Sequence, residues 1–356
     1  MSTTDIMIYG AYGFTGELVA RLAKDRGLTP ILAGRNAAKT QAIADTLGCE
    51  ARAFSLDDPA AVKNALTDVT VVIHCAGPFS ATSKPMADGC LATGTHYLDI
   101  TGEVDVFAAL ADRDAEAKKA GVMLLPGAGF DVVPTDCLAA HLAGKIDDPT
   151  HLTLAFRSVG GQSSRGTTNS LVESLPKGSK VRKNGKLVGS YPGGKTKKVD
   201  FGRGPVRTMG IPWGDLVTAY HSTGIPNIEV YTLVPTGALW GARFSGLIRP
   251  LLGLGPVQRF LKRRVAKMPA GPDETKRETA KSLIWGEVKN AAGDRAEARL
   301  TTCEGYTLTA HGALDIALRV VGGEAPPGFQ TPSKAYGADF VMTLPGVTRA
   351  DVFLGA

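Results

Sequence analysis

The stretch IMIYGAYGFTG, residues 6–16, decides the fold of the first part of the chain. Four residues typical of a short buried strand precede three glycines, Gly10, Gly13 and Gly16, and a segment with helical periodicity follows them. In such a strand–turn–helix the first glycine permits a tight turn. The second lets the backbone approach a pyrophosphate, and the third lets helix and strand pack closely. The N–H groups of residues 13–15 and the helix dipole would then hold phosphate groups.

The same alternation of strand and helix continues to about residue 130. Further segments typical of strands are PILAG, EARAFS, VTVVIHCAG, THYLDI and VMLLPGAG, and the segments between them have helical periodicity. Alternation of this kind predicts an α/β fold with a doubly wound parallel sheet, which is a Rossmann-like fold. Ligands of such sheets bind at the carboxyl ends of the strands.

The end of the second strand indicates which dinucleotide binds. Proteins that bind NAD usually carry an acidic residue there, which binds the ribose 2′-hydroxyl. This chain has AGRN at residues 33–36, so Arg35 offers a guanidinium that suits a 2′-phosphate, with Lys39 one helical turn on. We therefore expect NADP(H) as the cofactor. Asp57, after the third strand, is expected either to touch the adenine amine or to cap the next helix.

The expected cofactor site collects the ends of several strands. The turn CAGPF, residues 75–79, should lie along the nicotinamide ribose. Its cysteine is expected to be a small buried residue rather than a nucleophile, because no basic residue adjoins it. The expected cofactor-binding residues are Gly10, Tyr12, Gly13, Phe14, Thr15, Gly16, Gly34, Arg35, Asp57, Cys75, Ala76, Gly77, Pro78 and Phe79.

A second glycine-rich motif makes a competing prediction. GSYPGGKT, residues 189–196, matches the phosphate-loop pattern G-x-x-x-x-G-K-[ST]. A true phosphate loop follows a strand and opens a helix. Here Asn184-Gly185 predicts a hairpin before the match, Pro192 removes one backbone N–H, and the residues after Thr196 have no helical period. We therefore expect a hairpin region rather than a triphosphate site.

Composition indicates a globular protein with reduced thiols. The chain is 44% apolar and 21% charged, and its five cysteines are scattered and odd in number, which favours a cytoplasmic location. The six histidines lack metal-ligand spacing, so no metal site is expected. Residues 239–261 are apolar at helical spacing, and we interpret them as a buried helix; the alternatives are an interfacial helix or the wall of a pocket for a lipid-like substrate.

The excess of basic residues lies in one region. Residues 177–207 hold ten Lys and Arg residues and one acid, whereas the rest of the chain is slightly acidic. Nucleic-acid-binding surfaces interleave such charges with aromatic residues, and only Tyr191 and Phe201 occur in this region. We expect no nucleic acid partner. A solvated hairpin is favoured over a funnel for an anionic substrate.

Several stretches resemble the saccharopine dehydrogenase (reductase) family. They include YGAYGFTG, LAGRN, VVIHCAGPF, GTHYLDITGE and LLPGAGFDVVPTDCLA, and similar stretches continue through PWGDLVTAYHSTGIPNIEVY to GFQTPSKAYGADF. The resemblance spans nearly the whole chain and extends to an uncharacterised branch that contains the trans-acting enoyl reductases of lipid synthesis. It implies a nucleotide domain, a second domain built on an antiparallel sheet with helices, and a C-terminal segment that returns to the first domain.

The resemblance also implies domain boundaries. We expect an NADP-binding Rossmann domain at residues 1–130, a second domain for substrate or oligomerisation at 131–325, and a returning segment at 326–356. Strand-like segments with alternating polarity, HLTLAFRSV, NIEVYTLV, SLIWGEVKN and ARLTTCEG, support a second α+β domain with a mainly antiparallel sheet. A homodimer formed through this domain would be ordinary.

Two residues are candidates for catalysis. The G-L-D-P-G signature of the family falls on GFDVV, which places its aspartate at Asp131. Tyr97 alternates with Asp99 and Thr101, so these three side chains should point to one side of the sheet near its carboxyl end. Hydride transfer needs a proton donor or a substrate that is already cationic, and we expect Asp131 or Tyr97 to be the donor. Phe79 stands where saccharopine reductases carry a tyrosine, which argues against saccharopine as the substrate.

The expected activity is hydride transfer from NADPH to a C=N or C=C bond. The substrate would be a small molecule derived from an amino acid or resembling a lipid. The alternative is a non-catalytic NADP(H)-binding sensor or scaffold. Phe79 favours this alternative, whereas a complete second domain favours the enzyme.

Overall fold

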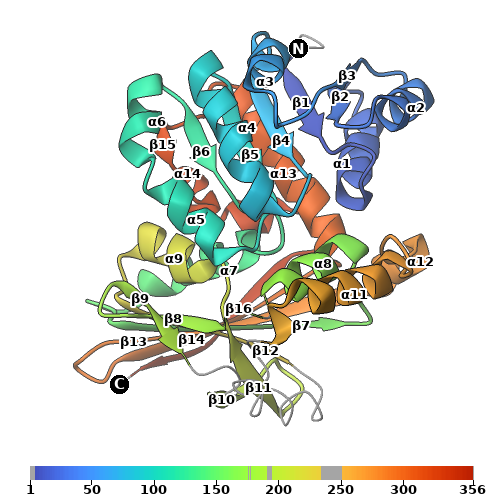
Figure 1. Cartoon of the computed structure of the whole chain (residues 1–356). Coiled ribbons are helices and arrows are strands. Elements are labelled where there is room, and N and C mark those ends of the chain that lie inside the picture. Colours follow the sequence, from blue (N-terminus) through green and yellow to red (C-terminus); the bar gives the residue numbers. More distant parts are fainter. Residues whose placement is uncertain (1–4, 175, 177, 191–194, 234–250, 356) are drawn as a thin grey trace. The chain divides into compact units, whose positions relative to one another are not determined.

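A computed structural model describes residues 5–174, 176, 178–190, 195–233 and 251–355 (Figure 1). The chain divides into two compact units, and neither is continuous in sequence. The first unit contains Met1–Val133 and Tyr306–Tyr336, and the second contains Pro134–Gly305 and Gly337–Ala356.

The first unit is built on a seven-stranded parallel sheet with the order β15-β6-β5-β4-β1-β2-β3. Its strands are β1 (Ile6–Tyr9), β2 (Ile31–Gly34), β3 (Ala51–Ala53), β4 (Val71–His74), β5 (His96–Asp99), β6 (Met123–Leu125) and β15 (Gly328–Phe329). Its helices are α1 (Phe14–Asp25), α2 (Ala37–Leu47), α3 (Pro59–Leu66), α4 (Phe79–Thr93), α5 (Val104–Ala111), α6 (Asp114–Ala120), α13 (Gly305–Val321) and α14 (Pro332–Tyr336). The strand order reverses between β1 and β4, which is the switch point where doubly wound sheets bind ligands. The predicted Rossmann-like sheet is confirmed.

The sequence forms this sheet because helices cover both of its faces. All four residues of β1 and of β4 are buried, and both strands are apolar apart from their last residue. On α1 the buried residues are Gly16, Val19, Ala20 and Ala23, which recur at helical spacing and face the sheet.

The second unit is built on a nine-stranded sheet with the main order β10-β11-β12-β7-β13-β14-β16, and β8 pairs with β12 and β9 beside this path. Its strands are β7 (His151–Val159), β8 (Ser179–Lys183), β9 (Lys186–Ser190), β10 (Thr196–Asp200), β11 (Pro205–Ile211), β12 (Asn227–Leu233), β13 (Lys281–Lys289), β14 (Arg295–Thr302) and β16 (Thr348–Gly355). Helices α7 (Val133–Ala143), α8 (Arg165–Ser174), α9 (Asp215–Thr223), α11 (Gly255–Ala266) and α12 (Glu274–Thr279) accompany it. Neighbouring strands are antiparallel apart from β7 and β12, so the predicted, mainly antiparallel sheet is confirmed.

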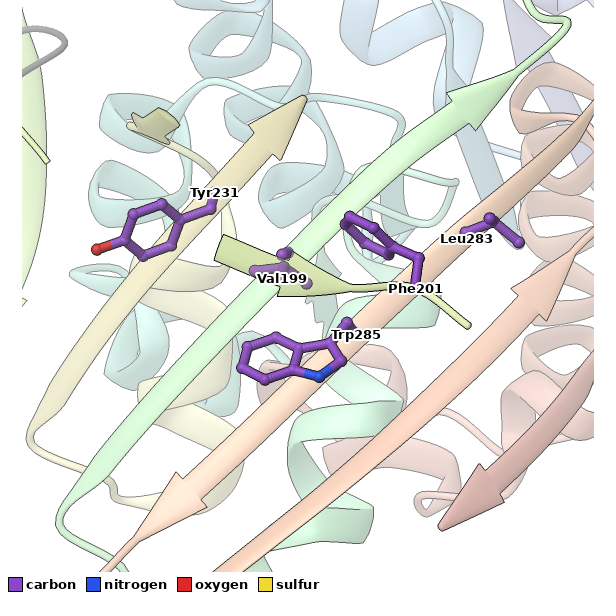
Figure 2. Packing of buried hydrophobic residues seen from close by; sticks show 6 residues of the cluster. Val199, Phe201, Tyr231, Leu283 and Trp285 are labelled. Carbon is purple, nitrogen blue, oxygen red and sulfur yellow. The ribbon is translucent and has the colours of Figure 1, made fainter. Parts of the chain in front are cut away.

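Both faces of this second sheet carry packed side chains. Helix α7 packs on one face, because a Cβ atom at Gly286 would lie 2.6 Å from the Leu142 side chain. On the other face Ala155, Tyr231 and Trp285 occupy neighbouring positions on β7, β12 and β13. Figure 2 shows β10 crossing this face, with Val199 and Phe201 over the row. The resulting cluster also contains Leu283.

The ends of the two units differ from the boundaries expected from sequence. Strand β15 and helix α14 belong to the first unit, as a returning segment would, but β16 pairs with β14 of the second sheet. Most of α13, expected in the second domain, lies in the first unit, where Thr309 Oγ1 accepts a hydrogen bond of 2.9 Å from Phe130 N. Helical periodicity and strand alternation showed the elements but not the sheet to which each belongs.

The basic region contains hairpins, as expected. Strands β8 and β9 pair through a tight turn in which Asn184 and Gly185 have φ angles of 49° and 75°. Thr196 begins β10 rather than a helix, and the Lys195 ammonium donates to Glu229. Residues 191–194 of the motif lie outside the described residues. A strand where a phosphate loop needs a helix rules out that interpretation of the motif.

The interpretation of residues 239–261 as a buried helix is wrong for the part that the structure describes. Residues 239–250 lie outside the described part. Leu251 and Leu254 are exposed, and of the twelve described residues of α11 only Val265 is buried. In the described residues, no helix combines the length and the apolar character needed to cross a membrane.

Candidate functional site

The N-terminus of α1 presents backbone N–H groups that need a partner. Gly13 precedes the helix, and no side chain of the described residues caps it. The N–H of Gly13 donates to Gly10 O at 2.9 Å, whereas the N–H groups of residues 14–16 precede the first intrahelical donor, Glu17 N. The next two helices differ, because Asn36 caps α2 and Asp58 caps α3 through their side chains. Of these three described helix starts, the one at the switch point is therefore open to an anion.

The glycines at this turn are required by close packing. Gly10 has a φ of 87°, and a Cβ atom there would lie 2.9 Å from Ala76 N. A Cβ atom at Gly16 would overlap Gly10 O. The glycines thus let the turn after β1 contact both α1 and the turn after β4, which supports the packing roles expected of Gly10 and Gly16. The N–H of Gly13 was expected to hold a phosphate, but it donates to Gly10 O.

A methyl group at Gly16 should therefore destabilise the first unit. We expect Gly16→Ala to lower the free energy of unfolding by about 2 kcal/mol, because the turn and the helix must move apart. Urea unfolding monitored by circular dichroism measures the change. The matched control is Gly189→Ala, at a position where a Cβ atom meets no atom within 4 Å and should change stability by less than about 0.5 kcal/mol. Equal effects of the two substitutions would contradict this account.

Arg35 lies at the end of β2 beside the glycine turn. Its side chain is exposed and has no hydrogen bond or ion pair with the described part of the chain. The Tyr12 ring covers Gly34, because a Cβ atom there would lie 2.5 Å from Tyr12 Cε1. The Lys39 ammonium lies 5.9 Å from the centre of the same ring. Lys39 thus lies near the ring that covers Gly34, and Arg35 follows Gly34 directly in the chain, an arrangement that suits a phosphorylated ribose.

Asp57, which was expected either to touch the adenine amine or to cap the next helix, is not the cap of α3. Asp58 is the cap of α3, and its carboxylate accepts from Ala60 N and Ala61 N. Asp57 instead accepts a hydrogen bond of 3.0 Å from the Ser55 hydroxyl and stays exposed. Burial raises the pKa of Tyr9 to about 12; among smaller electrostatic effects, Arg35 lowers this pKa and Asp57 raises it. The capping alternative for Asp57 is therefore wrong, and contact with the adenine stays a prediction.

The turn after β4 lies directly against the glycine turn. A Cβ atom at Gly10 would come within 3.0 Å of Cys75 C as well as of Ala76, and the Gly77–Pro78 peptide bond is cis. The Thr82 hydroxyl donates to Ala76 O at 2.7 Å and so fixes the turn. Burial, and to a smaller extent Asp99, raises the pKa of the Cys75 thiol to about 12. A thiol with this pKa is not a nucleophile at neutral pH, in agreement with the sequence analysis.

Glu103 has a role that the sequence did not indicate. Its carboxylate accepts hydrogen bonds from Phe79 N at 2.9 Å and Ser80 N at 3.0 Å, which are the first N–H groups of α4. A carboxylate thus occupies the N-terminus of α4 and competes with any phosphate there. A capping residue is normally recognised next to its helix, and Glu103 lies more than 20 residues further along the chain.

Tyr97 and Asp99 form a buried pair at the carboxyl end of β5. The Tyr97 hydroxyl donates to Asp99 Oδ2 at 2.6 Å, and Asp99 Oδ1 accepts from Thr101 N at 3.0 Å and Gly127 N at 2.9 Å. Burial raises the pKa of Asp99 to about 6 despite these hydrogen bonds, and it also raises the pKa of Tyr97 far above its usual value. The side chains share a side of the sheet, as alternation predicted, and they tie the ends of β5 and β6 together.

Asp131 lies after β6, against the turn that follows β5. A Cβ atom at Gly102 would lie 2.5 Å from Asp131 Oδ2, so the carboxyl packs on bare backbone. Burial raises the pKa of Asp131 to about 7. A carboxyl with such a pKa is partly protonated at neutral pH and can donate a proton, as an ordinary surface aspartate cannot.

Two further residues of the first unit were missed by sequence reasoning. Tyr306 at the start of α13 packs edge-on against Phe14, with ring centres 5.1 Å apart, so α13 reaches the glycine turn from a distant part of the sequence. His74 is fully buried, and burial lowers its pKa to about 3, so it is a neutral histidine that contacts Phe79. The only available signal for His74 was a polar residue at the end of a buried strand.

Comparison with known proteins agrees with this geometry. Residues 6–125 match the family described as the saccharopine dehydrogenase NADP binding domain. This stretch of the first unit is thus similar to saccharopine dehydrogenase NADP-binding domains. A nicotinamide dinucleotide is therefore its cofactor, and the open start of α1 and the Arg35 side of the site fit the phosphates of that group.

Two sequence relatives are named as trans-acting enoyl reductases. A candidate trans-acting enoyl reductase of Mycobacterium tuberculosis is 33% identical over 184 residues, which are 48% of this chain and 44% of that protein. A trans-acting enoyl reductase of Mycobacterium leprae is 32% identical over 150 residues, which are 40% of this chain and 36% of that protein. The matched stretch thus spans less than half the length of these relatives.

The fold of the whole chain has a solved counterpart. Apo saccharopine dehydrogenase (L-Glu forming) from Saccharomyces cerevisiae superposes with a TM-score of 0.64 over 98% of this chain and 100% of that chain. The two sequences are 14% identical, so this likeness shows the fold. It confirms a saccharopine dehydrogenase-type architecture with one Rossmann-like sheet and one mixed, mainly antiparallel sheet.

Proposed function

We propose that the protein is an NADP-dependent oxidoreductase that reduces a C=N or C=C bond, with Asp131 as the proton donor. The observation that carries this proposal is the position and pKa of Asp131. The Asp131 side chain has a pKa of about 7 and follows β6 of the parallel sheet. The start of α1 and Arg35, which are suited to NADP(H), follow other strands of the same sheet. A general acid is most effective when its pKa is close to the working pH.

The residues expected to hold the cofactor fall into three groups. The backbone N–H groups of residues 14–16 would bind the pyrophosphate, Arg35 and Lys39 would bind the 2′-phosphate, and the turn 75–79 would lie along the nicotinamide ribose. When bound, the reduced nicotinamide supplies a hydride. The Gly-lined contact between the turns after β1 and β4 lets the backbone approach the cofactor closely.

The proton comes from the protein. Reduction of a double bond needs a proton on the atom that does not receive the hydride. The Tyr97 hydroxyl already donates to Asp99 and has a pKa far above neutrality, so we assign Tyr97 a supporting role. Asp131 remains as the group of the expected pair that can release a proton near pH 7.

The names of the relatives are consistent with two classes of substrate. Enoyl reductases are named for C=C bonds and saccharopine dehydrogenases for an amino-acid substrate, and we keep both within the proposal. All five cysteines are free thiols, which supports a reducing, cytoplasm-like location.

The proposal is tested by measuring NADPH oxidation with a substrate panel. The panel contains cyclic imino acids, 2-keto acids paired with amines, and enoyl thioesters of different chain length. We expect NADPH to bind in the absence of substrate, and one class of the panel to give turnover that depends on protein concentration. Tight NADPH binding without turnover for any class would instead favour the non-catalytic sensor.

A further inference from the structure

Helix α11 of the second unit exposes an unusual combination of side chains. Among the described residues, seven large hydrophobic side chains are exposed, and four of them, Leu171, Leu251, Leu254 and Phe260, lie on α8, on α11 or just before α11. Phe260 and Leu251 are 57% and 55% exposed. Figure 1 shows α8 and α11 side by side within this unit. Surface hydrophobic residues are normally scattered, so this concentration indicates a contact surface.

The inner face of α11 is already satisfied. Gln258 Nε2 donates to Val172 O at 3.1 Å, the Lys262 ammonium donates to Glu173 at 2.5 Å, and Val265 is buried. These contacts hold α11 on α8 and fix which side of the helix faces outward. The outward residues are therefore not needed for packing inside the unit.

The outer face of α11 is strongly cationic. Arg259, Arg263, Arg264 and Lys267 are exposed and form no ion pair within the described residues. The Arg264 guanidinium lies 5.4 Å from the centre of the Phe260 ring. Residues 251–272 contain no Asp or Glu, so no acid in this segment offsets these charges. We call these four cations, together with Leu251, Leu254 and Phe260, the α11 surface.

We propose that the α11 surface binds the surface of an anionic membrane. Cations bind acidic headgroups, while the adjoining Leu and Phe side chains bury their apolar area at the boundary with the acyl chains. Charge alone would serve equally for a nucleic acid. The exposed leucines decide against that, because they gain nothing from a phosphate backbone, whereas an anionic bilayer satisfies both kinds of side chain. This contact would bring the protein to the bilayer surface.

Co-sedimentation of the full-length protein with lipid vesicles tests this proposal. One set of vesicles contains equal parts of phosphatidylglycerol and phosphatidylcholine, and the other contains phosphatidylcholine alone. We expect binding to the first set only, with an affinity that falls as salt is raised. Arg259→Gln combined with Arg263→Gln should weaken binding by about tenfold or more, since each cation near an anionic surface contributes measurably. Phe260→Ser should weaken it about fivefold through lost apolar burial.

Matched controls separate this surface from general basicity. Lys186→Gln combined with Arg203→Gln removes two exposed cations elsewhere in the second unit, and Val188→Ser removes an exposed apolar side chain. Both controls should bind vesicles as the unaltered protein does. Circular dichroism reports that each variant is folded. NADPH affinity, which is expected to depend on the first unit, distinguishes failure here from failure of the proposed reductase activity.

Three outcomes would overturn the proposal. The first is the absence of binding to anionic vesicles, and the second is equal binding to both kinds of vesicle. The third is displacement of the protein from vesicles by a single-stranded oligonucleotide, together with oligonucleotide binding that Phe260→Ser leaves unchanged. In that case the occupant of the α11 surface would be nucleic acid.

Discussion

Asp131→Asn will reduce the turnover number for NADPH-dependent reduction by about a hundredfold or more, because a general acid contributes at least this much to such reactions. The affinity for NADPH should stay within about twofold, since the open N-terminus of α1 and Arg35 are unchanged. Stopped-flow absorbance at 340 nm measures the first quantity, and quenching of protein fluorescence measures the second. A variant that keeps full turnover would remove Asp131 from the reaction.

The pH dependence gives this prediction a second readout. Only protonated Asp131 can donate, so turnover of the unaltered protein should fall as pH rises through its pKa of about 7, and Asp131→Asn should lack this decline. Stability changes in the same direction. Because the pKa is raised in the folded state, this contribution to stability is complete below the usual aspartate pKa and is lost as pH rises through the folded pKa. The Asn variant should therefore be the more stable protein above neutral pH.

Tyr97→Phe is the comparison that separates the two catalytic candidates. It removes the hydroxyl that donates to Asp99 but leaves the pKa-raising environment of Asp131 in place. If Asp131 is the donor, Tyr97→Phe should keep the decline of turnover above neutral pH even where the rate is reduced. If Tyr97→Phe loses that decline and Asp131→Asn keeps it, Tyr97 is the proton donor and Asp131 is the supporting residue.

Arg35→Glu will reverse the preference between the two nicotinamide dinucleotides. Loss of charge-assisted hydrogen bonds and the introduction of a like charge should weaken NADPH binding by about a hundredfold at low salt. NADH has a hydroxyl where NADPH has a phosphate, and the new carboxylate can accept from it, so NADH affinity should be unchanged or higher. Isothermal titration with both cofactors measures the ratio.

The matched control for Arg35→Glu is Arg21→Glu. Arg21 is an exposed arginine on α1 that pairs with Glu17. Its substitution by glutamate reverses the same charge at a position away from the expected ribose site. Its substitution should leave the cofactor preference as it was. An unchanged preference in Arg35→Glu as well would exclude the guanidinium as the group that selects the phosphate.

The parallel sheet could be predicted from sequence because its signals are local. Strand, glycine turn and helix follow one another within residues 6–27, and the alternation of strand and helix continues through four further strands, β2–β5, to β6. Two smaller conclusions also depend on neighbours in sequence: that the Cys75 thiol is not a nucleophile, and that Tyr97 and Asp99 point to the same side of the sheet. The structure agrees with both.

What could not be predicted depends on pairs that are far apart in the chain. Glu103 caps a helix that begins at Phe79, and Tyr306 packs on Phe14, and neither partner carries a mark of the other in sequence. Residues 326–356 were expected to return to the first domain, but β16 pairs with β14 of the second sheet, because strand order is a property of the folded sheet. The exposure of Phe260 was missed because helical periodicity identifies a face without stating what covers it.

The return of β16 to the second sheet has a consequence for how this protein can be divided. The chain passes from one unit to the other after Val133, after Gly305 and after Tyr336, so three connections join the same two bodies. No single cut of the chain separates the two units intact. A fragment that ends at Val133 lacks α13 and β15 of the first unit, and a fragment that begins at Pro134 contains both of these elements without the rest of their sheet. Exchange of the second unit during evolution would need three coordinated crossovers, which favours divergence by point substitution over shuffling of parts.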